Sequence, residues 1–119
     1  MDIEITHNSC IAVKVHGEID IGNVDEFSAM LEKAARDSQN RCLVVDLSSA
    51  TYIDGAGIKE VLRIYQRLSS LGGAIAVVPS KMAQRILEIL RAHELPGFEI
   101  CDDFQTATKA LLSYTGNSQ

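Results

Sequence analysis

The sequence predicts an α/β fold in a single domain, with a mixed, mainly parallel sheet of about five strands and about four helices. Short runs of apolar and β-branched residues at 43–47 and 74–78 are typical of strands buried on both faces. Between such runs, apolar residues recur at intervals of three and four, as in amphipathic helices packed on a sheet. Strands that alternate with helices indicate right-handed crossovers and parallel pairing.

Length and composition fit one globular domain and exclude several classes of protein. The chain has 119 residues, and we expect its core within residues 3–112 and a polar tail at 113–119. A net charge of -5 argues against nucleic acid as a partner, because phosphate binding needs a basic surface. No apolar run is long enough to insert into a membrane, and the first residues lack the basic start of a signal peptide. We therefore expect a cytoplasmic protein.

The first part of the chain predicts a hairpin followed by a helix. Apolar and polar residues alternate in 3–5 and 11–15, which indicates two antiparallel strands joined by a short turn. Residues 17–23 are expected to form a polar connection, with Asn23 as the cap of the next helix. A loop is expected at residues 37–40. The apolar positions of the helix are Val24, Phe27, Leu31 and Ala34.

The central part predicts a buried strand at 43–47, a turn, and a long helix that begins near Ile58. Asp54 stands at the N-cap position, where its carboxylate can accept hydrogen bonds from the first N–H groups and suits the helix dipole. Gly72 and Gly73 are expected to end the helix. Its apolar stripe consists of Ile58, Val61, Leu62, Tyr65, Leu68 and Leu71.

The last part predicts two further strands, each followed by a helix. A buried strand at 74–78 precedes a helix capped by Ser80, and a short strand at 98–101 precedes a final helix capped by Asp102 or Asp103. The apolar positions of these helices are Ala83, Ile86, Leu87 and Leu90 in the first, and Phe104, Ala107, Leu111 and Leu112 in the second.

The residue types of catalytic and metal sites occur without the spacing that such sites need. The three histidines have no i, i+4 pair, and the three cysteines, expected to be buried thiols, have no C-x-x-C spacing. Ser48, Ser49 and Thr51 lack the turn that exposes a hydrolase nucleophile, and we interpret them as loop hydroxyls. We therefore expect no catalytic residue, metal or cofactor.

Gly55, Ala56 and Gly57 open the central helix and leave its first N–H groups bare of side chains. Such groups favour an anion, so a small nucleotide-binding or enzymatic domain is an alternative. Against it, Asp54 places a negative charge at the same point, and the glycine motifs that bind phosphate are absent. Asp46 and Asp54 also do not supply the acidic pair of a phosphoacceptor domain.

Three segments together resemble the STAS domain of bacterial anti-sigma-factor antagonists. They are Gly17-Glu18-Ile19-Asp20, Val45-Asp46-Leu47-Ser48 and Tyr52-Ile53-Asp54-Gly55-Ala56-Gly57-Ile58. The similarity extends over residues 3–112, with the same order and spacing of elements. It implies a protein that binds an anti-sigma factor, a serine kinase of the histidine-kinase ATPase type, and thereby releases a sigma factor.

The resemblance also implies a switch that this chain lacks. In the family, phosphorylation of a Ser or Thr directly after the motif's Asp prevents docking, because phosphate adds nearly two negative charges to a close contact. Gly55 occupies that position here. Three alternatives follow. The chain is a constitutive antagonist, or it is modified elsewhere, with Ser48, Ser49 and Thr51 as candidate acceptors. The third alternative is a STAS subunit of another assembly, such as a transport or stress-signalling complex.

In a STAS-like fold, the connection at residues 20–21 and the turn at 55–57 lie near one another. Small residues there would let the backbone of a partner approach closely. Alternatively, the glycines serve only the tight turn from strand to helix. We expect the partner-binding surface to consist of Asp20, Ile21, Asp54, Gly55, Ala56, Gly57, Ile58 and Lys59.

Overall fold

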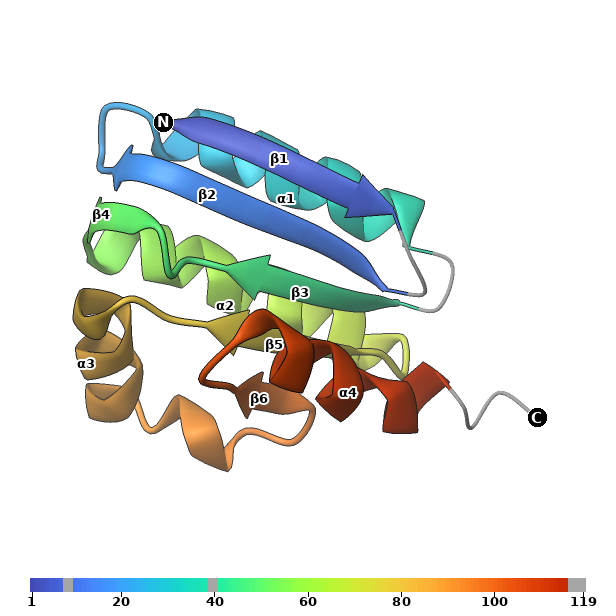
Figure 1. Cartoon of the computed structure of the whole chain (residues 1–119). Coiled ribbons are helices and arrows are strands. Elements are labelled where there is room, and N and C mark those ends of the chain that lie inside the picture. Colours follow the sequence, from blue (N-terminus) through green and yellow to red (C-terminus); the bar gives the residue numbers. More distant parts are fainter. Residues whose placement is uncertain (8–9, 39–40, 116–119) are drawn as a thin grey trace.

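The computed structural model describes residues 1–7, 10–38 and 41–115, which form a sheet covered by helices (Figure 1). The strands are β1 (Asp2–His7), β2 (Ile11–Ile19), β3 (Cys42–Asp46), β4 (Ala50–Ile53), β5 (Ala74–Val78) and β6 (Phe98–Ile100). The helices are α1 (Val24–Asp37), α2 (Gly55–Ser70), α3 (Lys81–Ile89) and α4 (Phe104–Thr115), with the 3-10 helix η1 at Ala92–Glu94.

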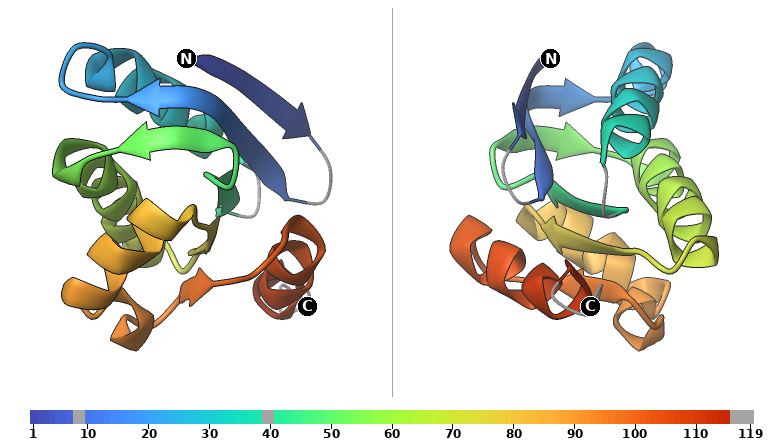
Figure 2. Two further views of the ribbon diagram at one scale, coloured as in Figure 1. Left: turned by 60° about the vertical axis from the view of Figure 1, so that its left-hand side comes forward. Right: turned by 90° about the vertical axis from the view of Figure 1, so that its right-hand side faces the viewer.

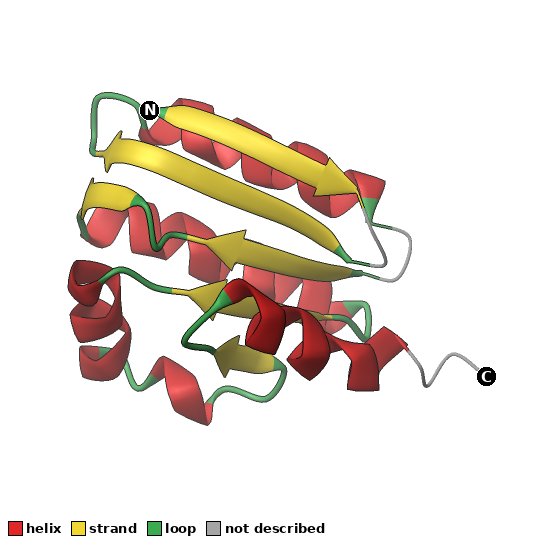
Figure 3. Cartoon of the chain, in the orientation of Figure 1, coloured by secondary structure: helices red, strands yellow, loops and turns green. Residues whose placement is uncertain are grey.

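The sheet is mixed and mainly parallel, which confirms the predicted fold class. Its strands follow the order β1-β2-β3-β5-β6, and β4 pairs with β2 beside this path (Figure 3). Only the pairing of β1 with β2 is antiparallel among the described strands. In the right-hand view of Figure 2, α1 and α2 cover one face of the sheet and α4 covers the other.

The sixth strand, β4, was not predicted, because residues 50–53 were expected to be part of a turn. β2 is longer than expected and continues to Ile19, so that its second half pairs with β4. A β-bulge lies between Gly17 and Glu18, and Gly17 has a φ of +91°, a value that glycine adopts at little cost. The expected connection at 17–23 is therefore confined to residues 20–23.

Two apolar clusters form the core, one on each face of the sheet. The larger one lies under α1 and α2 and includes Ile19, Phe27, Leu31, Leu43, Ile53, Ile58, Ile64, Leu68 and Ile75. The smaller one lies under α4 and consists of Cys10, Ala12, Cys42, Val44, Ala74, Ala76, Val78, Cys101, Ala107 and Leu111. The prediction that the strands at 43–47 and 74–78 are buried on both faces is confirmed.

The sequence missed one core residue of the helices and wrongly assigned four others to the core. Ile64 was not assigned to the apolar stripe of α2 but is fully buried. Leu71 and Leu90 are 53% and 51% exposed, because α2 ends at Ser70 and α3 ends at Ile89. Phe104 and Leu112 are 40% and 46% exposed, since only one side of α4 faces the sheet.

The predicted caps are correct for three of the four helices. The carboxylate of Asp54 and the hydroxyl of Ser80 accept hydrogen bonds from the first turns of α2 and α3, and Asp103 Oδ1 accepts one from the Thr106 N–H at 2.7 Å. The side chain of Asn23 accepts no such bond from α1. Residues 113–115, expected to be part of a polar tail, belong to α4.

Parts of the predicted hairpin turn, loop and tail lie outside the described residues. These are residues 8–9, 39–40 and 116–119. The end of α2 is as expected, with Leu71 as the C-cap and Gly72 after it at a φ of +84°. Within the part of the chain that the structure describes, no helix has the length and apolar character that a membrane span requires.

Candidate functional site

The register of β2 and β4 brings two segments together at the carboxyl ends of these parallel strands. Ile19 pairs with Ile53, the last residues of the two strands. Asp20 and Asp54 therefore leave the sheet side by side, and the turn at residues 20–23 lies next to the start of α2. This is the arrangement that the resemblance implied for the two segments.

The turn after β2 is held by four hydrogen bonds among its own residues and the end of the strand. The Asp20 N–H donates to Asn23 Oδ1 at 2.9 Å, and the Gly22 N–H donates to Asp20 Oδ1 at 2.8 Å. The Asn23 N–H donates to the Asp20 carbonyl at 3.1 Å, and Asn23 Nδ2 donates to the Glu18 carbonyl at 2.8 Å. Ile21 stands at the tip of this turn and is 83% exposed. An apolar side chain is thus presented to solvent on an ordered turn.

Asp54 satisfies the first N–H groups of α2. Its Oδ1 accepts hydrogen bonds from the Ala56 N–H at 3.1 Å and the Gly57 N–H at 3.3 Å. The expectation that the N–H groups at this turn are bare is therefore wrong for these two residues. Because a carboxylate occupies the position that an anion would need, the geometry does not favour a phosphate site here.

Gly55 and Gly57 lie two residues apart but differ in their surroundings. A Cβ atom added to Gly55 would meet nothing within 4 Å, and the φ of this residue is not in the left-handed region. A Cβ on Gly57 would lie 2.8 Å from Ile53 Cγ1 and 3.0 Å from Ile19 Cγ2. Gly55 thus faces open solvent, whereas Gly57 lets α2 approach β2 and β4.

The exposed part of the predicted partner-binding surface is smaller than the sequence indicated. Gly57 and Ile58 are buried in the core, with Ile58 fully inaccessible, so neither offers a side-chain contact to a partner. Asp54 serves as the cap. The accessible residues are Asp20, Ile21, Gly55, Ala56 and Lys59, which we call the corner surface.

The three candidate hydroxyls lie away from the corner surface. Ser48 Oγ donates a hydrogen bond to Asp46 Oδ1 at 2.6 Å, and Asp46 is only 4% exposed. Ser48 and Ser49 precede β4 and so lie at the opposite end of this strand from the corner surface. Thr51 is exposed, but it lies in β4 rather than in a loop, which corrects the interpretation of this residue.

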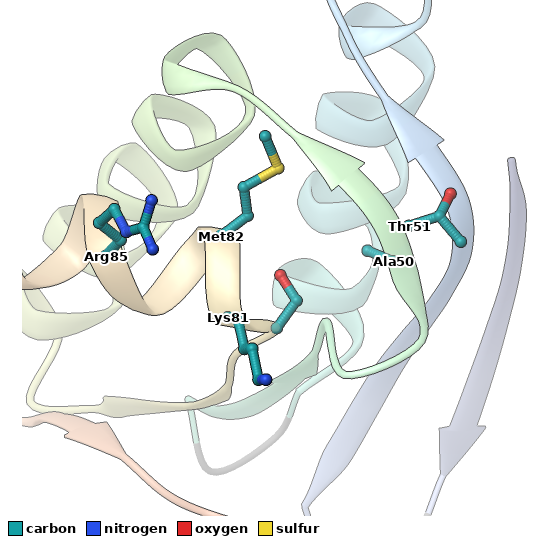
Figure 4. Close-up of a pocket in the computed structure, with 6 residues that line it drawn as sticks. Ala50, Thr51, Lys81, Met82 and Arg85 are labelled. Atoms are coloured by element: carbon teal, nitrogen blue, oxygen red, sulfur yellow. The ribbon is translucent and has the colours of Figure 1, made fainter.

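A cavity of about 370 Å³ lies between the start of β4 and the first turn of α3 (Figure 4). It is lined by Ala50, Thr51, Ser80, Lys81, Met82 and Arg85. Lys81 and Arg85 supply two positive charges to this lining. Among the described side chains that line the cavity there is no carboxylate, imidazole or thiol, and so no pair of a general acid and a general base. Met82 is 43% exposed, and the sequence analysis did not identify it as a lining residue of a cavity. It lies outside the predicted apolar stripe of α3.

The middle of α2 is occupied by contacts with α1. The Arg63 guanidinium donates to Glu32 Oε2 at 2.7 Å and to Glu60 Oε1 at 2.9 Å, and Arg67 also pairs with Glu32. Ser28 Oγ donates to Glu60 Oε1 at 2.7 Å. The hydrogen bond from Arg63 lowers the pKa of Glu32, and those from Ser28 and Arg63 lower the pKa of Glu60. A partner that docked along this face would have to replace these contacts.

The model of the STAS domain matches residues 2–107, which is most of the chain. The chain belongs to the STAS domain family. The prediction made from the three sequence segments is thereby confirmed. No curated protein is similar enough in sequence to count as a match.

Several solved structures share the fold of this chain. An anti-sigma factor antagonist from Mycobacterium paratuberculosis has a TM-score of 0.82 at 22% identity, and 93% of each chain is covered. An anti-sigma-factor antagonist domain protein from Planctomyces limnophilus has a TM-score of 0.72 at 18% identity, with 94% of this chain and 96% of that chain covered. The phosphorylated form of the Bacillus cell fate determinant SpoIIAA has a TM-score of 0.68 at 14% identity, with 92% and 97% covered.

Proposed function

We propose that this STAS protein is an anti-sigma-factor antagonist that binds an anti-sigma factor through the corner surface and thereby frees a sigma factor. The observation that carries the proposal is Ile21, which is 83% exposed on an ordered turn beside the start of α2, where Gly55 faces open solvent. The function named for its structural relatives supports this assignment. We expect the protein to act in the cytoplasm and to catalyse no reaction.

The composition of the corner surface suits a protein partner. Apolar side chains that fill a pocket at the centre of an interface contribute much of the binding energy, and Ile21 can serve as such an anchor. Gly55 and Ala56 next to it allow the partner's backbone to approach closely. Lys59 lies one helical turn after Gly55, on the same face of α2, and adds a positive charge that can pair with an acidic group.

We further propose that binding is constitutive with respect to the usual phosphorylation switch, and that the partner is an anti-sigma factor of the serine kinase type. Gly55 and Ala56 have no hydroxyl, so a kinase that reached this turn would find no acceptor. Ser48, one of the two candidates that precede β4, already donates its hydroxyl proton to Asp46.

A binding titration tests the location of the interface. Kinase-type anti-sigma factors from the source organism would be titrated by calorimetry with the wild type, Ile21→Ser and Ile89→Ser. We expect Ile21→Ser to weaken binding by about tenfold or more, because it removes an apolar anchor. Ile89, which is 75% exposed at the end of α3, is the matched control and should change the affinity by less than about twofold. Equal effects of the two variants would remove the corner surface from the interface.

A phosphorylation assay tests the missing switch. Incubation with the partner kinase and ATP should leave the Gly55 turn of the wild type unlabelled, whereas Gly55→Ser should be labelled in that turn. The added hydroxyl would stand in open space, so the variant should fold normally.

In the same titration, Gly55→Asp should weaken binding by placing a negative charge in the contact. A phosphopeptide of the wild type labelled at Ser48, Ser49 or Thr51 would overturn constitutive binding. Unchanged affinity of Gly55→Asp would remove this turn from the interface.

A further inference from the structure

Two cysteines meet at the amino ends of neighbouring parallel strands. Ile11 of β2 is paired in register with Leu43 of β3, and Cys10 and Cys42 each stand one residue earlier. Neighbouring strands are about 4.8 Å apart, which lies within the range of about 4.4–6.8 Å that the Cα atoms of a disulfide span. The backbone therefore places these residues within reach of a covalent bond.

The two side chains also point to the same face of the sheet. Both belong to the apolar cluster under α4, with Cys10 4% and Cys42 0% exposed. The Cys10 thiol is hydrogen-bonded to the sulfur of Cys42, and this contact raises the pKa of Cys10 and lowers the pKa of Cys42. The two sulfur atoms are therefore neighbours within one apolar cluster.

We propose that Cys10 and Cys42 form an oxidation site, at which a hydroperoxide converts the two thiols into an intramolecular disulfide. The thiolate of one of the two cysteines attacks an oxygen of hydrogen peroxide and breaks the O–O bond, which gives a sulfenic acid and hydroxide. The sulfur of the other cysteine then attacks the oxidised sulfur, the S–S bond forms, and water leaves. Two thiols together lose two electrons and two protons, and the peroxide is reduced to two molecules of water.

Burial of the two thiols limits the rate of this reaction. Oxidants reach buried thiols only when the structure opens locally, so the site should react more slowly than an exposed thiolate. The last turns of α4 pack on the cluster that contains the pair, through Leu111 and Tyr114. Opening of this helix would admit a molecule as small as hydrogen peroxide.

Cys101 provides an internal control, because it is buried in the same cluster but is out of reach. Cys42 pairs with Ala74 on β5, whereas Ile100, the residue before Cys101, pairs with Val77. Cys101 is therefore displaced by about four residues along the strand direction, or about 13 Å, and lies two strands away from Cys42. Burial raises the pKa of the Cys101 thiol, which disfavours its thiolate.

Peptide mapping of the folded wild-type protein tests the proposal. The protein would be treated with hydrogen peroxide, alkylated, and digested without reduction for mass spectrometry. We expect a linked peptide pair that joins Cys10 to Cys42, with their alkylation reduced at least about fivefold relative to Cys101 and restored by dithiothreitol. A linkage through Cys101, a linkage between two chains, or a Cys10–Cys42 linkage that forms only in urea would overturn the proposal.

Single variants separate the two reacting cysteines from the control. Cys101→Ala should keep the linkage, whereas Cys10→Ala and Cys42→Ala should each abolish it. Because each substitution removes a buried side chain, circular dichroism should confirm that the variants fold before oxidation. The map of the wild type decides the question if a variant does not fold.

Discussion

The first turn of α2 and the middle of the same helix differ in what they contact. At the first turn, Gly55 faces open solvent and a carboxylate from the preceding residue closes the helix end. In the middle, Arg63 joins Glu32 of α1 to Glu60 of α2. Docking at the first turn would break no such ion pairs among the described residues, whereas docking at the middle would separate charged groups from their partners. The difference indicates that one end of α2 is suited to an external partner and that its middle holds α1 in place.

The first turn itself has an outer and an inner side. Gly55 on the outer side leaves space that a larger side chain could occupy, while Gly57 on the inner side touches Ile19 and Ile53. Binding and folding thus depend on different glycines of one short motif. Substitutions at the two positions can therefore test the roles separately.

The largest effect is expected for Gly57→Ala. The added Cβ would lie 2.8 Å from Ile53 Cγ1, closer than real contacts allow, so α2 or the isoleucine must move. We expect the free energy of unfolding to fall by about 1–3 kcal/mol in urea titrations, the usual cost of overpacking a core. Gly55→Ala is the matched control and should leave stability unchanged or raise it by about 0.4–1 kcal/mol, because it restricts the unfolded chain. Equal losses of stability for both variants would contradict the distinction between an exposed Gly55 and a packed Gly57.

A smaller effect is expected for Asp54→Ala, which removes the N-cap of α2. The Ala56 and Gly57 N–H groups would lose their acceptor, and we expect the free energy of unfolding to fall by about 1 kcal/mol. Ser80→Ala, at the equivalent position of α3, is the comparison, since Ser80 Oγ accepts one hydrogen bond from the Ala83 N–H at 3.2 Å. A loss at Ser80 but none at Asp54 would show that the corner does not depend on its cap.

Local sequence patterns were sufficient to predict most of the fold. The caps at Asp54 and Ser80 and the buried strands at 43–47 and 74–78 follow from residue types over a few neighbouring positions, and all are present. β4 could not be predicted because it has four residues and forms only by pairing with the extended end of β2.

The corner surface was predicted only in part, for a related reason. Sequence identified Gly55 and Gly57 together, but the burial of Gly57 depends on Ile19, which comes from a distant part of the chain. The exposure of Ile21 follows from the hydrogen bonds of its turn. The contact between Arg63 and Glu32 spans 31 residues of sequence and needs α1 and α2 to be packed side by side.

The smallest effect is expected from the ion pairs in the middle of α2, tested by Arg63→Met at several pH values. The folded-state pKa of Glu32 and of Glu60 lies below the ordinary value, so these carboxylates stabilise the fold above the unfolded pKa of about 4.3. This stability is lost as the pH falls through the lower folded-state pKa. Because the groups are partly exposed and screened by solvent, we expect Arg63→Met to cost about 0.5–1 kcal/mol at pH 7 in urea titrations.

The cost of the same variant should fall as the pH drops below about 4.3, and it should vanish once both glutamates are protonated in the folded protein and no longer pair with a cation. The cost at pH 7 should also shrink in about 1 M salt, since salt screens exposed charges. Arg36→Met at the end of α1 is the control, because Arg36 forms no ion pair within residues 1–7, 10–38 and 41–115. A cost for Arg63→Met that stayed constant from pH 7 to acid would mean that the aliphatic part of Arg63 stabilises the two helices by packing. In that case the charged middle of α2 would differ less from its first turn than the ion pairs indicate.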